Sequence, residues 1–477
     1  MKVLSVASEC APLIKTGGLA DVAGALPGAL ARQGVEMRTL LPGYPAVHDA
    51  LEGGTQVMTD SNLFGGPAQV LHGTAAGLDV YVLDAAHLFY REGGPYAAPD
   101  GFDWWDNADR FAALDWVAAQ LCTYGAAGWK PDVLQAHDWQ GGFAAVYLQR
   151  LGGAQSVGSV LTIHNIAFTG SVGADRLGWL RLPAEGYNPG GFEFFGRISA
   201  LKAGIAYSDK VNTVSPTYGQ ELMTPEFGMG FDGALRARGA DFSGILNGID
   251  TDVWDPATDP AIETFKSPRT KTRARAALVA EFGLLPDQGP ICVVVSRLTE
   301  QKGLDLLLDA LPELLDRGGQ LVLLGSGDPA LEQGYLAAAA ANPGRVAVRI
   351  GYDEPMSHRI IAGGDAILVP SRFEPCGLTQ LYGLRYGTIP VVATTGGLVD
   401  TVIPLTVATR LAGAATGIQF RSGNSDALRG AIAQLCTVYS EPEVWTRMQQ
   451  AAMKHPVGWD VSAAAYAALY AEAAKTP

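Results

Sequence analysis

The chain has 477 residues, enough for about two to four domains of ordinary size. Hydrophobic residues make up 48% and charged residues 17%, a balance that supplies large apolar cores and excludes a disordered chain. The 34 Lys and Arg residues against 48 Asp and Glu residues give a net charge of −14, which argues against nucleic acid and anionic membranes as partners.

The N-terminal residues and the cysteines indicate a cytoplasmic protein. The first apolar run, residues 3–7, is too short for a signal peptide, and the longest uncharged stretch, 151–174, is too polar to span a membrane. The five cysteines are odd in number and show no CxxC spacing, which favours reduced thiols without a structural metal. They are Cys10, Cys122, Cys292, Cys376 and Cys436.

The first half of the chain repeats a strand, a Gly-rich turn and a helix. Residues 3–7 predict a buried strand, and apolar residues three and four positions apart over 19–30 predict the first helix, which Pro27 should kink. Further strands are expected at 37–41, 80–83, 133–136, 160–163 and 210–213. Strands that alternate with helices predict a parallel sheet with right-handed crossovers.

The second half starts the same pattern again. Residues 291–295 predict a central parallel strand, and the leucines of 304–315 predict a helix closed by two glycines. Strands should follow at 321–324, 366–369 and 391–393. Pro256, Pro260 and Pro268 cluster between the halves and mark a break in the regular structure. A helix is expected after them, at 271–282. We therefore expect an α/β fold of two Rossmann-like, doubly wound domains, 1–245 and 246–456, which face each other across a cleft.

Two glycines follow the first predicted strand, in the segment Lys15-Thr16-Gly17-Gly18-Leu19. They let the backbone approach a ligand closely, and the helix after them offers free N–H groups and a positive dipole end to an anion. Lys15 adds a full positive charge. The alternative is an ordinary turn with a surface lysine, and the order of residues is not that of a Walker P-loop.

Two cations, Arg297 and Lys302, come shortly after the strand 291–295. Guanidinium and ammonium groups at the carboxyl end of a strand favour an anionic partner such as a phosphate. The alternative is a pair of surface ion pairs with Glu300 or Asp305.

The segment 374–380 follows the strand 366–369. Glu374 could hold sugar hydroxyls, or it could be a simple acid at a helix N-terminus. Backbone N–H groups near Gly377 could face a phosphate, and the side chain of Cys376 is expected to be a small buried group. The backbone positions proposed for this contact are Cys376, Gly377, Leu378 and Thr379.

Two polar clusters, 137–140 and 162–165, follow predicted strands of the first half. Both should lie at the same edge of the sheet, since the carboxyl ends of parallel strands meet there. A buried core histidine is the alternative for each cluster. Asp138 and His164 are the candidate ligands at this edge, and His164 fits a sugar hydroxyl or a leaving group better than a metal because no second ligand has zinc-like spacing.

Aromatic and acidic residues are concentrated over 96–111, where sugar rings could pack on aromatic faces. Tyr96, Asp103 and Trp139 are the candidates for binding an acceptor sugar, and the equal alternative is that the rings of this segment fill a domain surface. The triplet Asp250-Thr251-Asp252 has the spacing of a metal-binding DxD motif, but it falls in the proline-rich break and no metal is assigned to it.

Together these segments resemble the bacterial glycogen synthase and plant starch synthase family, the retaining glucosyltransferases that use ADP-glucose. The resemblance covers essentially the whole chain and also includes 244–250 and 374–381. It implies the GT-B fold, and a last segment, 457–477, that forms a helix crossing back to the first domain.

The resemblance also implies roles for the candidate residues. Lys15 and Gly18 would bind the nucleotide sugar, and Arg297 and Lys302 its phosphates. Tyr352 would stack on adenine. The residues implied around the transferred glucose are Asp138, His164, Asn247 and Glu374. Many other retaining GT-B enzymes carry a second glutamate eight positions after the first, but Tyr382 stands there in this chain, so the contact to the ribose is unassigned. The glycogen and starch synthases also lack that glutamate.

The implied reaction moves glucose from ADP-glucose to the 4-hydroxyl of an α-1,4-glucan with retention, with no metal or other cofactor. The preference for ADP over UDP follows from the resemblance alone. Two alternatives remain at this stage: a glucan phosphorylase, which needs a Schiff-base lysine for pyridoxal phosphate, and a non-catalytic sugar-binding protein of two lobes.

Overall fold

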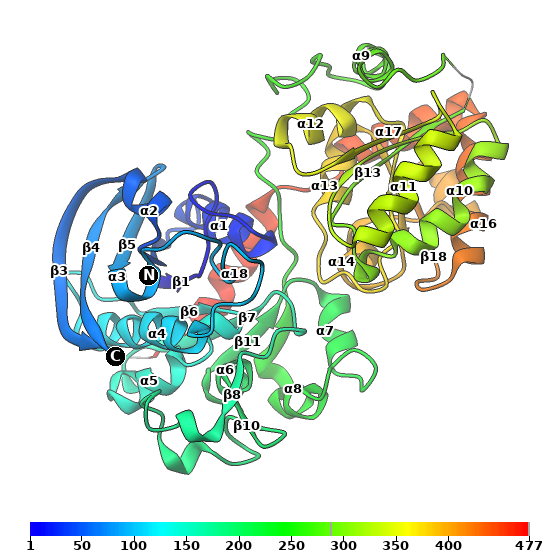
Figure 1. Cartoon of the computed structure of the whole chain (residues 1–477). Helices are drawn as coiled ribbons and strands as arrows, with labels where there is room; N and C mark the ends of the chain where they lie inside the picture. Colours follow the sequence, from blue (N-terminus) through cyan, green and yellow to red (C-terminus); the bar gives the residue numbers. More distant parts are fainter. Residues whose placement is uncertain (287–288, 476–477) are drawn as a thin grey trace. The chain divides into compact units, whose positions relative to one another are not determined.

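In the computed structural model the chain folds into two compact units (Figure 1). Unit 1 comprises Met1–Asn247 and Trp459–Pro477, and unit 2 comprises Gly248–Gly458. The structure describes residues 1–286 and 289–475, so the last two residues of the expected segment 457–477 and two residues of the expected break lie outside the description. The sequence placed the changes of domain after residues 245 and 456, and the units change after Asn247 and Gly458.

Unit 1 is built on a sheet in the order β12-β11-β7-β6-β1-β2-β5-β4-β3. Every neighbouring pair from β12 to β5 is parallel. The strands are β1 (Lys2–Val6), β2 (Glu36–Pro42), β3 (Leu51–Leu63), β4 (Gly66–Ala75), β5 (Leu78–Asp84), β6 (Val133–His137), β7 (Gly158–Ile163), β11 (Lys210–Thr213) and β12 (Phe242–Gly244). Each strand that the sequence predicted in this half is present, within one or two residues at its ends.

The antiparallel strands β3 and β4 at one end of this sheet were not predicted. They are rich in Gly, Thr and polar residues, and β3 is mostly exposed, so the sequence carries no buried apolar run at this place. A small separate sheet, β8 (Ser171–Gly173), β10 (Arg197–Ser199) and β9 (Glu193–Phe194), was missed for the same reason.

The helices of unit 1 include the predicted first helix, α1 (Gly18–Ala31), which continues past Pro27. The other helices of this unit are α2 (Pro45–Ala50), α3 (Ala86–Phe89), α4 (Asn107–Tyr124), α5 (Ala144–Arg150), α6 (Ala200–Tyr207), α7 (Pro216–Leu222), α8 (Asp232–Arg238) and α18 (Trp459–Ala473).

The last helix, α18, belongs to unit 1 although it follows the whole of unit 2 in sequence. Figure 1 shows this red helix beside the blue α1, and its apolar side packs into the core of α1 and the central strands. The Tyr470 hydroxyl donates to Gln135 Oε1 at 2.6 Å in the buried interior. A Cβ at Gly158, where β7 begins, would lie 2.1 Å from the Ala473 carbonyl oxygen, so this glycine permits the close approach of the helix end.

Unit 2 holds a parallel sheet in the order β15-β14-β13-β16-β17-β18. Its strands are β13 (Ile291–Val295), β14 (Gln320–Gly325), β15 (Val346–Ile350), β16 (Ala366–Val369), β17 (Ile389–Ala393) and β18 (Ile418–Phe420). Its helices are α9 (Thr272–Phe282), α10 (Leu304–Asp316), α11 (Pro329–Ala341), α12 (Glu354–Gly363), α13 (Thr379–Tyr386), α14 (Gly396–Thr401), α15 (Val407–Ala412), α16 (Ser425–Tyr439) and α17 (Pro442–Lys454). The predicted strands and the helix of leucines are again present.

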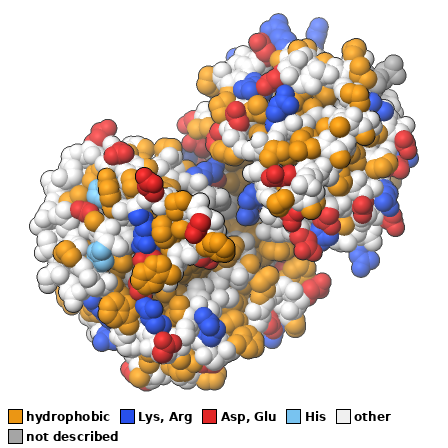
Figure 2. All heavy atoms as spheres, viewed as in Figure 1, with side chains coloured by type: hydrophobic (Ala, Val, Ile, Leu, Met, Phe, Trp, Pro, Cys, Tyr) orange, Lys and Arg blue, Asp and Glu red, His pale blue; other side chains and the backbone are white. Residues whose placement is uncertain are grey.

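Each unit has an extensive apolar interior. The central strands β13 and β14 are almost fully buried, as parallel strands covered on both faces should be. On the face shown in Figure 2, acidic and basic side chains of the described residues are interspersed, without a large basic area. No helix among the described residues is long and apolar enough to cross a membrane.

Candidate active site

The polar residues of unit 1 gather where β1, β6 and β7 end, next to one another in the sheet. The chain proceeds from β1 to β2 on one side and from β6 to β7 on the other, so β1 and β6 form the switch point of the parallel sheet. Parallel α/β sheets bind their ligands outside the carboxyl ends of strands at such a point.

Glu9, just after β1, organises the glycine loop. Its carboxylate accepts hydrogen bonds from the Thr16 hydroxyl at 2.8 and 3.0 Å, from the Gly17 backbone N–H at 3.3 Å and from the Thr16 backbone N–H. The Tyr96 hydroxyl donates to Glu9 Oε1 at 2.9 Å. Glu9 is 3% exposed, so these donors replace the water that a buried carboxylate loses.

The other predicted members of this loop lie at its outer side. Lys15 forms an ion pair with Asp21 at 2.8 Å, and both side chains are partly exposed. The helix α1 begins at Gly18, and Gly17 before it provides no side-chain cap. The first N–H groups of α1 therefore have no capping side chain, as the sequence argument for an anion required.

Asp138 is buried at the end of β6 with φ of 52°. This left-handed backbone is strained for a residue with a side chain, and such strain is typical of functional sites. One carboxylate oxygen accepts the backbone N–H groups of His164 at 2.6 Å and of Asn165 at 3.2 Å. Burial raises the pKa of Asp138 to about 7 although these two hydrogen bonds oppose the shift.

His164 stands at the end of β7 and is also buried. His137 Nδ1 lies 2.9 Å from His164 Nε2, and Ser5 Oγ lies 3.1 Å from His137 Nε2. Burial lowers the pKa of both imidazoles, for His137 to about 3, so both rings are neutral at pH 7.

The expected acceptor residues are not equivalent in the structure. Tyr96 is largely inside, since its hydroxyl binds Glu9 and lies 2.7 Å from Ser8 Oγ. Trp139 packs edge-on against Phe111, with ring centres 5.1 Å apart. Asp103 is exposed. The aromatic segment therefore contains two kinds of ring. Some pack inside the unit, whereas Phe102 and Trp105 are 76% and 82% exposed.

Asn247, the last residue of unit 1 before the chain enters unit 2, is 7% exposed. Its Oδ1 is buried and has no hydrogen-bond partner among the described residues. Buried amide oxygens are almost always satisfied, so this one is suited to accept from a ligand hydroxyl.

In unit 2, Lys302 and Glu374 are in direct contact. The ammonium group lies 2.5 Å from Glu374 Oε2, which also accepts from the Ser371 hydroxyl at 2.9 Å. They follow β13 and β16, neighbours at the switch point of this sheet. Gly303, with φ of 64°, permits the approach, because a Cβ there would lie 2.0 Å from the Pro370 carbonyl oxygen.

Neither ion pair that the sequence offered as an alternative for the two cations is present among the described residues. Asp305 instead holds Arg372, with two contacts of 2.6 and 2.7 Å. Arg297 is exposed and has no carboxylate partner in the described part of the chain. Tyr352 is 71% exposed, and its hydroxyl binds the Glu354 carboxylate at the start of α12.

The segment from Cys376 to Thr379 leads into α13. Gly377 has φ of 74°, and Cys376 is a buried thiol. Gln380 Nε2 donates to the carbonyl oxygens of Cys376 at 3.0 Å and of Gly377 at 2.9 Å, which fixes the turn. The helix starts at Thr379 after Leu378 without a side-chain cap, so its first N–H groups remain available.

The triplet 250–252 forms a turn in which Asp250 Oδ1 accepts the Asp252 backbone N–H at 2.9 Å. Among the described residues no group of three or more His, Cys, Asp or Glu side chains could hold a metal ion.

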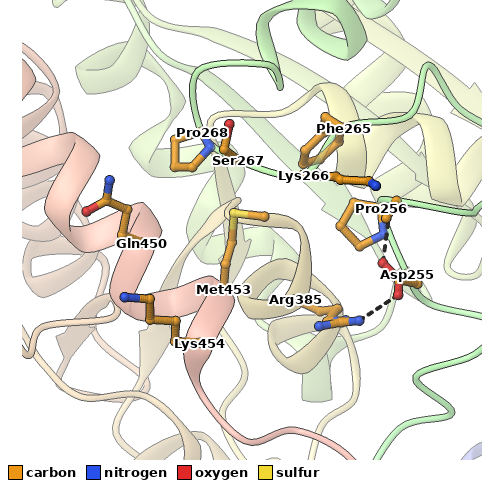
Figure 3. Close-up of a pocket in the computed structure, with 11 residues that line it drawn as sticks. Asp255, Pro256, Phe265, Lys266, Ser267, Pro268, Arg385, Gln450, Met453 and Lys454 are labelled. Atoms are coloured by element: carbon orange, nitrogen blue, oxygen red, sulfur yellow. Dashed lines mark hydrogen bonds and ion pairs between the residues drawn. The ribbon is translucent and has the colours of Figure 1, made fainter.

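One further pocket of unit 2, about 440 Å³ in volume, lies between the segment 255–268 and the end of α17. Arg385 pairs with Asp255 at 2.8 Å. Figure 3 shows Lys266 and Lys454 on opposite sides of the labelled residues, so their ammonium groups do not converge on one ligand. None of the predicted site residues lines this pocket.

Sequence reasoning missed Ser5, Glu9 and Ser371, and it left His137 out of the named site residues although His137 belongs to the cluster 137–140. Glu9 and His137 do carry a signal, a polar residue directly at the end of a buried strand, but their partners lie 87 and 27 positions away. Only the fold brings these pairs together.

Two known family models match the chain. Residues 2–237 match a model described as the starch synthase catalytic domain, and residues 289–437 match glycosyl transferases group 1. A glycogen synthase of Paracoccus denitrificans is 59% identical over 98% of both chains. The chain belongs to the glycogen and starch synthase family.

Other members of the family extend the comparison. Glycogen synthase 1 of Rhizobium meliloti is 51% identical over 98% of both chains. The solved catalytic domain of starch synthase IV from Arabidopsis thaliana, bound to ADP and acarbose, aligns over 99% of both chains with a TM-score of 0.89 and 32% identity. A sucrose-phosphate synthase from Thermosynechococcus elongatus shares the fold, with a TM-score of 0.61 and 17% identity. The expected GT-B fold and glycosyltransferase activity are thereby confirmed.

Proposed function

We propose that this glycosyltransferase moves glucose from ADP-glucose to the 4-hydroxyl at the non-reducing end of an α-1,4-glucan, with retention of configuration. The single observation that carries this is the identity of 59% to a glycogen synthase over nearly the full length of both chains. It favours the transferase over the phosphorylase and the binding protein. ADP on a family structure supports a nucleoside diphosphate as the leaving group.

Stabilisation of the departing diphosphate is the main task of unit 2. Negative charge grows on ADP as the glucosyl bond breaks, and fixed cations lower the energy of that charge. Lys302 and Arg297 supply the cations, and the uncapped start of α13 supplies N–H groups. Lys302 pairs with Glu374, and we expect its ammonium group to exchange that partner for a phosphate oxygen when the donor binds.

The same cations make a metal unnecessary in our proposal, because they do the work that a divalent ion does in other sugar transferases. None of the five cysteines, all within the described residues, forms a disulfide, which fits a reducing compartment and supports a cytoplasmic location.

Glucose transfer is expected to proceed on one face, with attack from the side that ADP leaves and a phosphate oxygen receiving the acceptor proton. A double displacement would need a free carboxylate as nucleophile. Glu374 Oε2 already accepts from Lys302 and Ser371, and Asp138 Oδ1 accepts from two backbone N–H groups. Both candidates are therefore weakened as nucleophiles.

The test is incorporation of radiolabelled glucose into glycogen with ADP-glucose and UDP-glucose in parallel, each with and without EDTA. We expect faster transfer from ADP-glucose and no effect of the chelator. Equal rates from both donors would contradict the donor assignment, and loss of activity with EDTA would contradict the metal-free reaction. A covalent glucosyl adduct on Asp138 or Glu374, found by mass spectrometry, would contradict the proposal that the acceptor attacks from the side that ADP leaves.

A further inference from the structure

Three buried polar side chains form a line across the switch point of unit 1. Ser5 on β1, His137 at the end of β6 and His164 after β7 are 1%, 1% and 8% exposed. Ser5 Oγ lies 3.1 Å from His137 Nε2, and His137 Nδ1 lies 2.9 Å from His164 Nε2. The line ends at His164 Nδ1, for which no partner is found among the described residues.

Each ring carries one N–H group, because both imidazoles are held neutral by burial. Hydrogen bonding along the line can then run in one of two directions. In the first, Ser5 donates to His137 Nε2, His137 Nδ1–H donates to His164 Nε2, and His164 presents Nδ1–H. In the second every proton is reversed, and His164 presents a bare Nδ1 acceptor.

The hydroxyl of Ser5 decides between the two directions. In the second direction Ser5 accepts from His137, and its own proton needs another acceptor. No other hydrogen bond of Ser5 Oγ is found in the described part of the chain. A buried donor without an acceptor is costly, so the first direction is favoured.

We propose that Ser5 and His137 are positioning residues that fix the tautomer of His164, so that its Nδ1–H donates to a hydroxyl oxygen of the transferred sugar. This deepens the proposed function, on which its catalytic consequence rests. A sugar hydroxyl held in this way acts as acceptor at His164, and its own proton stays free for another partner, such as a carboxylate or an amide oxygen.

The structural part of the proposal is tested by nitrogen NMR of the full-length protein labelled with ¹⁵N-histidine. The chain has 7 histidines, and His137→Gln and His164→Gln identify the two resonance pairs. We expect both rings to be protonated at Nδ1 in the native protein. In Ser5→Ala the group that sets the direction is gone, so both tautomers become populated.

Thr39→Val is the matched control. Thr39 lies opposite Ser5 on β2, is fully buried, and its hydroxyl has no partner among the described residues. Its replacement removes a neighbouring hydroxyl of the same sheet without touching the line, so the tautomers should stay as in the native protein. Protonation of His164 at Nε2 in the native protein, or unchanged tautomers in Ser5→Ala, would overturn the proposal.

The catalytic part is tested by kinetics and by calorimetry with ADP. We expect Ser5→Ala to lower kcat/KM for the sugar donor about tenfold, the effect of one lost hydrogen bond, and Thr39→Val to leave it unchanged. The Kd for ADP, which lacks the sugar, should be the same in all three proteins. A tautomer change with normal kcat/KM would refute the role of His164 as a donor to sugar. If no glucosyl transfer were found in the native protein, the NMR result would still stand alone, so the two failures are distinguishable.

Discussion

Two buried carboxylates, Glu9 and Asp138, order the backbone at the switch point of unit 1. Each accepts backbone N–H groups from a segment that carries candidate ligands, the glycine loop for Glu9 and the end of β7 for Asp138. They are also close enough for the charge of Glu9 to raise the pKa of Asp138 further. Like charges in a buried site favour protonation of one partner.

This arrangement makes the stability of unit 1 depend on pH. Asp138 titrates near pH 7 when folded and near its ordinary value of 3.8 when unfolded, so the folded state binds more protons between these values. The free energy of unfolding therefore falls as pH rises from about 4 to 7, by roughly 4 kcal/mol at most.

Asp138→Asn removes this pH-dependent fall in the free energy of unfolding, because the amide carries no charge. Its oxygen can still accept hydrogen bonds from the two backbone N–H groups. Urea unfolding at pH 5 and pH 7.5 should show that the variant gains stability relative to the native protein as pH rises. His137 and His164 act with the opposite sign, since they protonate on unfolding in acid, but they are present in both proteins and cancel in the difference. An equal pH response of the two proteins would mean that Asp138 is charged when folded.

Lys302→Ala tests the central cation of unit 2. Loss of a charge aimed at the leaving diphosphate should lower kcat by about 10²–10³-fold. Lys266→Ala is the matched control, since Lys266 is an exposed cation of the same unit that lines the pocket of Figure 3. A near-normal rate for Lys302→Ala in the glycogen assay would remove this residue from the site.

At this scale the sequence suggested candidate ligands more readily than the residues that hold them in place. Lys302 and Glu374 could be found because each stands in a short motif after a strand. Ser5 and Ser371 could not, since a serine in or after a strand is common and only its spatial neighbour gives it a role. The pairing of Lys302 with Glu374 also needed the fold, because 72 positions separate them.

At the scale of elements, glycines mark where helices approach strands. Gly158 faces the end of α18, and a Cβ would meet a backbone oxygen at 2.1 Å. Gly158→Ala should destabilise unit 1 by about 1–3 kcal/mol because neither backbone can move freely.

Gly28 provides the contrast. It is exposed within α1, with nothing within 4 Å of an added Cβ. Gly28→Ala should stabilise unit 1 by about 0.5–1 kcal/mol, since alanine loses less backbone entropy in a helix. Thermal melting of both variants checks the opposite signs. A neutral Gly158→Ala would show that α18 shifts without cost.

Elements with a strong apolar pattern were predictable, and those without one were not. The runs of buried residues in β1, β6 and β13 predict parallel strands, and the spacing of the leucines in α10 predicts an amphipathic helix. The strands β3 and β4 have no such pattern, because their pairing with each other and with β5 depends on register rather than on burial.

At the scale of the whole molecule, the two units differ in how the chain builds them. Unit 2 is one continuous segment with its own core, whereas unit 1 is made of two segments separated by unit 2. The two connections run together, as the Ile249 backbone N–H donates to the Val457 carbonyl oxygen at 2.9 Å.

A chain of residues 248–458 should therefore fold alone, melt cooperatively and bind ADP through Arg297, Lys302 and Tyr352. Residues 1–247 alone should not, because α18 and its part of the core are missing. Joining 1–247 to 459–475 through a flexible linker of about ten residues should restore folding, since the two ends lie close together. Circular dichroism and calorimetry distinguish the three chains. A well-folded 1–247 would show that α18 is dispensable.

Because α18 comes last in the sequence, unit 1 can complete its folding only after the whole of unit 2 has been synthesised. Synthesis runs from the N-terminus, so all of unit 2 emerges before Trp459–Ala473 becomes available to α1 and β7. Until then the nascent unit 1 exposes the apolar surface that α18 covers, and exposed apolar surface of this kind favours aggregation. A chain that lacks α18 would thus keep unit 2 intact and damage unit 1, whose first segment is made first.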